Sequence, residues 1–346
     1  MTIKIGILGT SWIATQAVYA LKQIKAYEIK AVLGTSLESA NEFIAENVID
    51  AKGYDNYNQF LADDINCVYI ALPNSLHFQF AVQALENGKN AIVEKPIFST
   101  VKEYDEAKQL ADDKGLYLLE AMRSVYTKNH NIVRQLIKNS DHITGGTIIW
   151  KNYSSKYNNY KKGEQVRVFS KNYSGGALAD LGVYALSAAV DWFGMPDAYE
   201  YISRKVQRFA SGKIESDAAD SGGVIILKYK SFDISILLSK TQESFQNSEI
   251  YTDDSTFELD NIAAITTIKK YFTAADKSMG FHDDKAGRPY EELAQAENAD
   301  GMLLQEFEAF ASIIENGSTE NNNEKLYTRS SKLSKNVLTL LNQLNN

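Results

Sequence analysis

The first third of the chain alternates short apolar runs with longer amphipathic stretches. Runs rich in β-branched and aliphatic residues occupy positions 3–8, 28–34, 67–72, 90–94 and 116–121. The stretches between them have helical periodicity, and the first extends from about Trp12 to Ile24. Short strands joined by crossover helices are typical of a parallel sheet that is buried on both faces. The pattern therefore predicts a doubly wound, Rossmann-type α/β domain over residues 1–122, with ligands at the carboxyl ends of its strands.

The pattern changes after about Met122. Strand-like alternation appears at 142–150, 221–240, 255–260 and 264–272, and helical periodicity at 131–137, 176–194, 300–317 and 330–346. Residues 223–229 and 232–238, with a two-residue connection, predict a β-hairpin. Residues 319–325 are interpreted as a polar loop. This mixture predicts an α+β second domain over residues 123–346 with a largely antiparallel sheet.

Length, composition and charge narrow the class of protein. A chain of 346 residues predicts two domains, and 44% hydrophobic with 23% charged residues is typical of globular proteins. The net charge of −8 argues against a nucleic-acid or anionic-membrane partner, since either requires a basic face. No apolar run approaches the ~18 residues of a membrane span, and the amino terminus has no basic leader. We therefore expect a cytoplasmic protein.

Cys67 is the only cysteine, and it opens the apolar run 67–72. A single cysteine excludes an internal disulfide and fits a reducing compartment. Its place in an apolar run favours a buried structural thiol over a nucleophile.

The first apolar run leads into the turn GILGTSWIA, residues 6–14, which opens the first predicted helix. A strand, a tight turn and a helix form the context of a dinucleotide-binding fingerprint. Gly9 supplies the tight turn, Ser11 replaces the glycine that normally faces a pyrophosphate, and Ala14 permits close packing of helix on strand. An ordinary strand–turn–helix explains the same residues, so the motif alone leaves both interpretations open.

Two later runs also lead into polar residues: Pro73 and Asn74 follow the run 67–72, and Lys95 and Pro96 follow the run 90–94, which ends in Glu94. In a parallel sheet these positions lie on the same edge as Gly9. His77 follows in the next turn, and its alternatives are a cofactor contact or a surface or helix-capping histidine. Lys95 lies at the carboxyl end of a predicted buried strand, and Pro96 restricts the backbone directly after it. This arrangement indicates that the charge of Lys95 is directed toward a ligand.

The motifs GILGTSWIA, YIALPNSLH, EKP and GGALADLGVYAL occur in this order, and GMLLQEFEAF follows near the carboxyl terminus. Together they resemble the glucose–fructose oxidoreductase and inositol dehydrogenase (Gfo/Idh/MocA) family from Ile3 to about Gly194. The tyrosine in the fourth motif is similar to that of the dihydrodiol dehydrogenase-like members. The resemblance implies an NAD(P)-dependent dehydrogenase or reductase for sugars, polyols or diols. It also implies an open sheet in the second domain, through which a homodimer or larger oligomer forms.

The resemblance assigns roles to individual residues. Lys95 would reach toward both nicotinamide and the substrate hydroxyl, and Tyr184 would transfer the hydroxyl proton. If residues 176–194 form a helix, Asp180 and Tyr184 share one face, and Asp180 would orient the substrate or the lysine. The competing interpretation makes Tyr184 a core aromatic. The predicted cofactor contacts are Gly9, Thr10, Ser11, Trp12, Ile13, Thr35, Ser36, Leu72, Pro73, Asn74, His77, Glu94 and Lys95.

Two arginines are predicted to contact the substrate. Arg123 lies two residues before the position where relatives often carry an arginine-aromatic-x-proline pattern, which reads VYTK here. Arg167 matches a family arginine near the substrate, and a solvated arginine explains it equally well. Tyr153, Tyr157 and Tyr160 could form a wall on which a sugar stacks, although tyrosine is common throughout this chain, with 20 in all.

The end of the second predicted strand bears on the cofactor. NAD enzymes usually place an acidic residue there to hold the ribose 2′-hydroxyl. Here the strand ends at Gly34, and the first acidic residue is Glu38, inside the next helix. Thr35 and Ser36 can donate hydrogen bonds to a phosphate, and Ser36 is the predicted cap of that helix. Because relatives that prefer NADP often carry arginine in place of Thr35, the expected preference for NADP over NAD is modest.

The predicted function is hydride transfer between a nicotinamide cofactor and a carbinol carbon of a sugar, polyol or trans-diol. A small molecule is the expected partner, and no metal is expected. The alternative is a regulator or scaffold of the same fold that binds NAD(P) without turnover.

Overall fold

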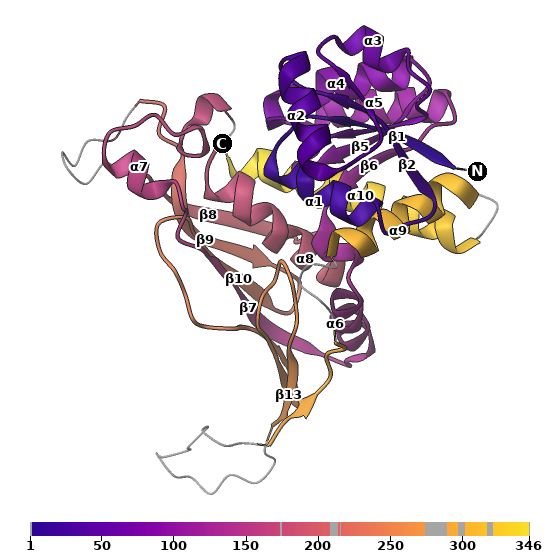
Figure 1. The fold of residues 1–346 in the computed structure, drawn as a ribbon. Helices are drawn as coiled ribbons and strands as arrows, with labels where there is room; N and C mark the ends of the chain where they lie inside the picture. Colours follow the sequence, from indigo (N-terminus) through magenta and orange to yellow (C-terminus); the bar gives the residue numbers. More distant parts are fainter. Residues whose placement is uncertain are drawn as a thin grey trace, which may run out of the picture. The chain divides into compact units, whose positions relative to one another are not determined.

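A computed structural model describes residues 2–173, 175–207, 214, 216–273, 289–296, 302–316 and 321–345. The chain forms two compact units (Figure 1). The first contains Met1–Tyr126 and Asp300–Gln343, and the second contains Thr127–Ala299 and Leu344–Asn346. The predicted division into residues 1–122 and 123–346 stays a prediction. The units differ from it in placing the two carboxyl-terminal helices with the first sheet.

The first unit is built on a six-stranded parallel sheet with the strand order β3-β2-β1-β4-β5-β6. Its strands are β1 (Ile3–Leu8), β2 (Tyr27–Leu33), β3 (Lys52–Tyr54), β4 (Cys67–Ile70), β5 (Asn90–Glu94) and β6 (Leu118–Ala121). Its helices are α1 (Trp12–Leu21), α2 (Leu37–Asn47), α3 (Tyr57–Leu61), α4 (Asn74–Glu86), α5 (Val101–Asp113), α9 (Met302–Asn316) and α10 (Asn321–Leu344), with the 3-10 turn η1 (Arg123–Tyr126). The doubly wound α/β prediction is confirmed.

Helices cover both faces of this sheet, because alternate residues of each strand point to opposite sides. One core joins the strands to α1, α2 and α9, where Phe307 and Phe310 are fully buried. The other core joins them to α3, α4 and α5, and Leu338 of α10 completes it. The carboxyl-terminal helices therefore belong to the cores of the first sheet, which explains why they fall in the first unit.

Several element boundaries differ from those predicted. Helix α1 ends at Leu21, and Ile24 packs against the core from the turn that follows. The three-residue strand β3 and the five-residue helix α3 are too short to produce a periodic signal, and they were not predicted. Helix α10 begins at Asn321, so the predicted polar loop at 319–325 is wrong over its helical part, while residues 319 and 320 lie outside the described residues.

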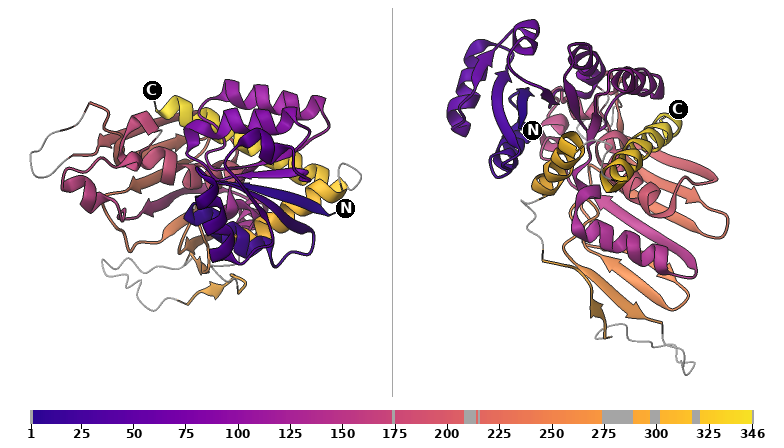
Figure 2. Two further views of the ribbon diagram at one scale, coloured as in Figure 1. Left: turned by 45° about the horizontal axis from the view of Figure 1, so that its top comes forward. Right: turned by 90° about the vertical axis from the view of Figure 1, so that its right-hand side faces the viewer.

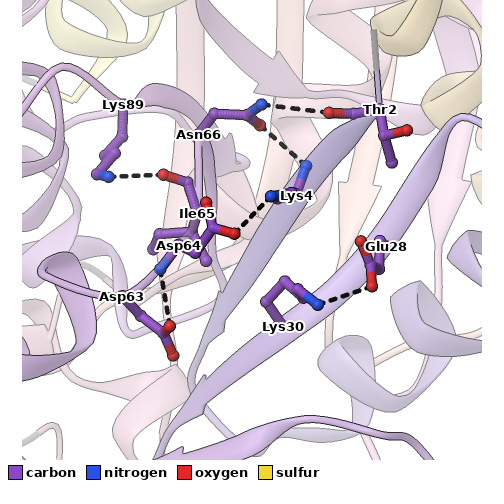
Figure 3. Close-up of polar contacts among 9 residues, drawn as sticks. All are labelled: Thr2, Lys4, Glu28, Lys30, Asp63, Asp64, Ile65, Asn66 and Lys89. Carbon is purple, nitrogen blue, oxygen red and sulfur yellow. Dashed lines mark hydrogen bonds and ion pairs between the residues drawn. The ribbon is translucent and has the colours of Figure 1, made fainter.

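Polar contacts join the amino ends of the strands, opposite the edge that is predicted to bind ligands (Figure 3). Lys4 pairs with Asp64, and its ammonium lowers the pKa of that carboxyl. The backbone N–H of Lys4 donates to Oδ1 of Asn66 at 3.0 Å, and Nδ2 of Asn66 donates to the Thr2 carbonyl at 3.3 Å. These contacts connect β1 to the entrance of β4.

The second unit contains an eight-stranded sheet with the order β14-β13-β12-β11-β7-β10-β9-β8. Neighbouring strands are antiparallel except β7 and β10, which are parallel. The strands are β7 (Ile143–Lys151), β8 (Ala198–Lys205), β9 (Asp220–Lys228), β10 (Asp233–Ser239), β11 (Ser248–Thr252), β12 (Ser255–Leu259), β13 (Ile268–Phe272) and β14 (Glu291–Glu292). This confirms the predicted α+β class. The β9–β10 hairpin is confirmed as well, with Lys228 opposite Asp233.

Helices of this unit lie along one face of its sheet (Figure 2). On one side, α8 (Val183–Phe193) packs against β7, and α6 (Lys128–Asn139) packs against α8. His130 joins these helices, with Nε2 2.9 Å from Oδ2 of Asp191. On the opposite side, Ile149, Leu237, Val224 and Ile202 lie in register across four strands and are half-buried or exposed. We refer to these four residues as the apolar row.

Helix α9 contains a buried carboxyl. Glu306 has 0% exposure, and neither of its oxygens has a hydrogen-bond partner in the described part of the chain. Burial is the largest cause that raises its pKa, the charges of Glu94 and Glu120 add to the rise, and the charge of Arg123 opposes it. An acid with a raised pKa stabilises the fold below its unfolded pKa, and this contribution is lost as the pH rises through the folded value.

We expect the substitution Glu306→Gln to remove this pH dependence. Between about pH 5 and pH 8, the free energy of unfolding of the wild type should fall relative to that of the variant by about 1 kcal/mol or more. Urea unfolding at each pH measures the difference. Glu308→Gln, at an exposed position of the same helix, is the matched control and should follow the wild type. Parallel curves for wild type and Glu306→Gln would show that this carboxyl does not titrate in the range.

Candidate functional site

The turn after β1 requires a glycine. Gly9 has φ of +109°, and a Cβ added there would lie 2.6 Å from the carbonyl oxygen of Ala71. Its N–H donates to the Leu33 carbonyl at 2.9 Å. The turn is therefore held against the carboxyl ends of both neighbouring strands, β2 and β4, at the edge where doubly wound sheets bind ligands.

Two helices begin at this edge without a side-chain cap. Ser11 is the N-cap of α1 and Pro73 that of α4, and neither side chain accepts a hydrogen bond from its helix. In contrast, α2, α3 and α5 are capped by Ser36, Asn56 and Thr100. An uncapped helix start presents backbone N–H groups and a positive dipole end to an anion. The turn of α1 therefore fits a pyrophosphate.

The remaining predicted contacts of these turns lie at the same edge. Thr10, Ser11 and Trp12 are exposed, with 70% exposure for Trp12, and Ile13 is half-buried. At the start of α4, Pro73 is exposed, whereas Leu72 and Asn74 are half-buried.

The end of β2 presents hydroxyls and no carboxylate. Thr35 and Ser36 are exposed between Gly34 and the first residue of α2. The predicted cap is confirmed, because Oγ of Ser36 accepts from the N–H of Ser39 at 3.1 Å. Accepting this bond leaves the hydroxyl proton of Ser36 available as a donor.

His77 lies in the interior. Its exposure is 0%, with Nε2 2.8 Å from the Leu72 carbonyl and Nδ1 3.0 Å from the Pro96 carbonyl. Burial is the largest cause that lowers its pKa, although the backbone hydrogen bonds oppose it. The ring therefore links the end of β4 to the turn after β5. Neither a surface position nor a helix cap describes it, and its predicted cofactor contact stays a prediction.

The backbone around Lys95 is held by two buried carboxylates. Glu94 accepts a hydrogen bond from the Tyr69 hydroxyl at 2.6 Å, and its other oxygen accepts from the N–H of Lys95 at 3.2 Å. Beyond the cis Lys95–Pro96 bond, the N–H of Ile97 donates to Glu120 at 2.9 Å. Burial raises the pKa of Glu94 and of Glu120, and the charge of Lys95 opposes the rise in both. Lys95 itself is half-buried at the ligand edge.

The positive charge of Arg123 partly offsets the negative charge of buried carboxyl groups in this unit. Arg123 is half-buried in η1, directly after β6, and its charge lowers the pKa of Glu94 and of Glu306. This electrostatic role within the first unit accounts for a cation at this position. Its predicted substrate contact stays a prediction.

In the second unit, the segment 176–194 is not one regular α-helix as predicted. Leu178–Gly182 forms a π-helical turn, η4, before α8 begins at Val183. The π turn widens the spacing of side chains, and such turns often occur at functional sites. Sequence periodicity does not distinguish a single π turn from an α-helix.

Asp220 of β9 fixes the start of this segment. Its carboxylate accepts hydrogen bonds from the N–H of Leu178 at 2.9 Å and from the Tyr201 hydroxyl at 2.5 Å. A Cβ at Gly176 would lie 2.0 Å from Oδ1 of Asp220, so the second glycine of GGALADLG permits the approach. Burial raises the pKa of Asp220, and these hydrogen bonds oppose the rise.

Asp180 pairs with Lys240, a residue that sequence reasoning missed. Lys240 follows β10 directly and has only 5% exposure. The signal for it was present, because "ISILLSK" places a lysine at the end of an apolar strand, as "NAIVEK" does for Lys95.

Tyr184 lies in the first turn of α8, with its ring centroid 6.4 Å from that of Trp150. It is half-buried, whereas every other residue from Leu181 to Val190 is buried. This partial exposure differs from that of a core aromatic. Two residues earlier, a Cβ at Gly182 would lie 3.0 Å from Cδ1 of Leu238, so the helix start lies directly on β10.

Arg167 lies at a separate cavity of about 370 Å³, which it lines together with Tyr173 and Asp217. It is exposed, and its guanidinium lies 5.3 Å from the ring centroid of Tyr173. Tyr157 and Tyr160 are each 4% exposed in a core with Phe169 and therefore do not form an open stacking wall.

Within the described ranges, no group of three or more histidine, cysteine, aspartate or glutamate residues is arranged to hold a metal ion. No helix in the same part of the chain has both the length and the apolar character needed to cross a bilayer.

Comparison with known proteins agrees with these features. A family model described as an oxidoreductase family with an NAD-binding Rossmann fold matches residues 3–121. The scyllo-inositol 2-dehydrogenase (NADP(+)) IolU of Bacillus subtilis is 31% identical over 261 residues, which cover 75% of this chain and 76% of that protein. The trans-1,2-dihydrobenzene-1,2-diol dehydrogenase of Xenopus tropicalis is 25% identical over 254 residues, covering 71% and 72%.

Among solved structures, the 3-ketoreductase KijD10 of Actinomadura kijaniata, in complex with NADP and TDP-benzene, has a TM-score of 0.79 at 18% identity. The match covers 99% of this chain and 97% of that one. At this identity the likeness shows the shared fold. The relatives, the family model and the fold together show that the chain belongs to the Gfo/Idh/MocA family of oxidoreductases, which have an NAD-binding Rossmann fold.

Proposed function

We propose that this oxidoreductase transfers a hydride between nicotinamide, with NADP favoured, and a carbinol carbon of a sugar, polyol or trans-diol. The observation that carries the proposal is Lys95, a lysine that buried carboxylates hold at the ligand edge of the parallel sheet. Inositol and diol dehydrogenases among the relatives support this class of substrate.

The first unit supplies groups that suit a dinucleotide. The Gly9 turn and the uncapped start of α1 would hold the pyrophosphate, with Thr10 to Ile13 around it. Leu72, Pro73 and Asn74 would border the cofactor at the end of β4. Thr35 and Ser36 would hold a ribose 2′-phosphate, because their hydroxyls donate and no carboxylate at the strand end repels it. When bound, the nicotinamide ring supplies the hydride or accepts it.

The protein residues move the proton and stabilise charge. Lys95 polarises the substrate oxygen as its charge changes. Tyr184 takes the hydroxyl proton in the oxidation direction and returns it in the reduction direction. Asp180 orients a substrate hydroxyl from the same helix start. Arg123 and Arg167 remain proposed substrate contacts.

A regulator that binds NAD(P) without turnover remains the second candidate. Its supporting observation is the pairing of Asp180 with Lys240, since a carboxylate engaged in an ion pair is also compatible with a purely structural role. A panel of sugars and diols, screened with both cofactors for absorbance at the reduced nicotinamide band, separates the two. Tight cofactor binding with no turnover across the panel would favour the regulator.

We also propose a homo-oligomer that forms through the open face of the eight-stranded sheet, and a cytoplasmic location. The apolar row, with Ile202 at 58% exposure, supplies a surface that a second copy would cover. Burial raises the pKa of the Cys67 thiol, and a single unreactive thiol suits a reducing compartment.

Tyr184→Phe should leave cofactor affinity unchanged and lower kcat by about a hundredfold or more, because it removes only the acid–base group. Lys95→Ala should be at least as damaging. Tyr251→Phe and Lys102→Ala, outside the candidate site, are the matched controls and should retain activity. Near-normal turnover by Tyr184→Phe would falsify its assigned role.

Cofactor affinities test whether the residues after β2 favour NADP over NAD. The wild type should bind NADP modestly more tightly than NAD, and Thr35→Asp should shift the preference toward NAD by about tenfold or more, because the new carboxylate repels a 2′-phosphate. Fluorescence titration of both cofactors measures this, with Thr35→Ser as control. Tighter binding of NAD by the wild type, by tenfold, would contradict the interpretation.

The oligomer proposal is tested by Ile202→Lys. A charge in the apolar row should reduce the mass measured by light scattering toward that of one chain, because a buried interface does not tolerate an unpaired ammonium. Lys102→Ala, at an exposed position of the first unit, is the control. A monomeric wild type at micromolar concentration would contradict the proposal.

A further inference from the structure

Lys240 and Asp180 form an ion pair whose two sides differ in exposure. The lysine side chain is 6% exposed, whereas that of Asp180 is 39% exposed. A buried ammonium is costly unless a carboxylate compensates it, so this lysine is held in place by Asp180. The Asp180 side chain is therefore only partly enclosed by the protein. The pair therefore lies at the border between the core of the second unit and its surface.

Three contacts place this pair beside the face that carries Tyr184. Asp180 contacts Lys240, Gly182 lies against Leu238, and Tyr184 lies beside Trp150. Leu238 is opposite Trp150 in the parallel β10–β7 register, and Lys240 follows two residues later, on the same side. Segment η4, the start of α8 and the ends of β10 and β7 thus lie next to one another within the second unit.

Other charged groups on the surrounding elements are directed elsewhere or engaged. Lys151, next to Trp150 on β7, alternates to the opposite face, where it lines a cavity of about 560 Å³ with Arg204. Asp220 of β9 accepts from Tyr201 and from the backbone of η4. Asp191, at the far end of α8, pairs with His130 of α6. Lys240 pairs with Asp180.

The arrangement resolves a conflict in the proposed function. A carboxylate close to a phenol opposes release of the phenol proton, because the product carries a second negative charge. Asp180 lies four residues before Tyr184, across the junction of η4 and α8, and an uncompensated charge there would hinder proton transfer. An ammonium on Asp180 cancels this field while leaving the carboxylate able to accept a hydrogen bond.

We propose that Lys240 is a positioning residue for the reaction, which fixes the Asp180 carboxylate and neutralises its charge so that Tyr184 can release and regain a proton. This inference rests on the proposed function. Lys240 acts through Asp180 and does not touch the substrate.

The test compares Lys240→Met, Lys240→Arg and the exposed control Lys228→Met. Lys240→Met should leave cofactor affinity unchanged, lower kcat for oxidation near pH 7 by about tenfold, and move the rising limb of the kcat profile up by about one pH unit. Lys240→Arg should restore most of the loss, and Lys228→Met should match the wild type. In an Asp180→Asn background, Lys240→Met should cause no further shift of the profile, because the charge it compensates is absent.

A uniform loss of kcat with an unchanged pH profile would overturn the proposal and leave Lys240 a structural residue. A measurement without substrate distinguishes failure of the Lys240 proposal from failure of the proposed function. With [13Cζ]-tyrosine labelling, the Tyr184 resonance is identified by its absence in Tyr184→Phe. Its titration midpoint should rise by about one pH unit in Lys240→Met. If Lys240→Met unfolds, the same measurement is made on Lys240→Arg and Lys240→Gln. Equal titration midpoints of the Tyr184 resonance in these two variants would overturn the proposal.

Discussion

A parallel sheet that is buried on both faces confines the chemistry of the first unit to the edges of the sheet. Its strands offer no exposed face, because helices α1, α2 and α9 cover one side and α3, α4 and α5 the other. Polar groups therefore gather where the strands begin or end. The amino edge is occupied by structural contacts such as Lys4 with Asp64, and the carboxyl edge carries Gly9, Ser36 and Lys95.

Close approach of backbone to neighbouring groups sets the positions of the functional segments. Gly9 approaches the Ala71 carbonyl, Gly176 approaches the Asp220 carboxylate, and Gly182 approaches Leu238. In each case a side chain at the glycine would meet an atom at 3.0 Å or less. These contacts fix the turn before α1 and the start of α8 without placing any functional side chain inside the core.

Carboxylates accompany both lysines that end apolar strands, and those beside Lys95 are buried. Glu94 and Glu120 accept from the backbone on either side of Lys95, and Asp180 pairs directly with Lys240. Burial raises the pKa of Glu94 and of Glu120, while Lys95 counteracts the rise. Charge balance in a region of low dielectric thus couples the fold of the first unit to the ionisation of the groups around Lys95.

The sequence by itself determined the elements with strong periodicity, the doubly wound class, the family resemblance and the strand-end position of Lys95. These depend on local patterns of a few residues, which the chain carries whatever its tertiary contacts. Tertiary structure alone decided that His77 is buried, that a π turn precedes Tyr184, that α9 and α10 complete the first cores, and that Lys240 meets Asp180. Lys240 and Asp180 are separated by 60 residues, and no local pattern encodes a contact that forms only when β10 and η4 pack together.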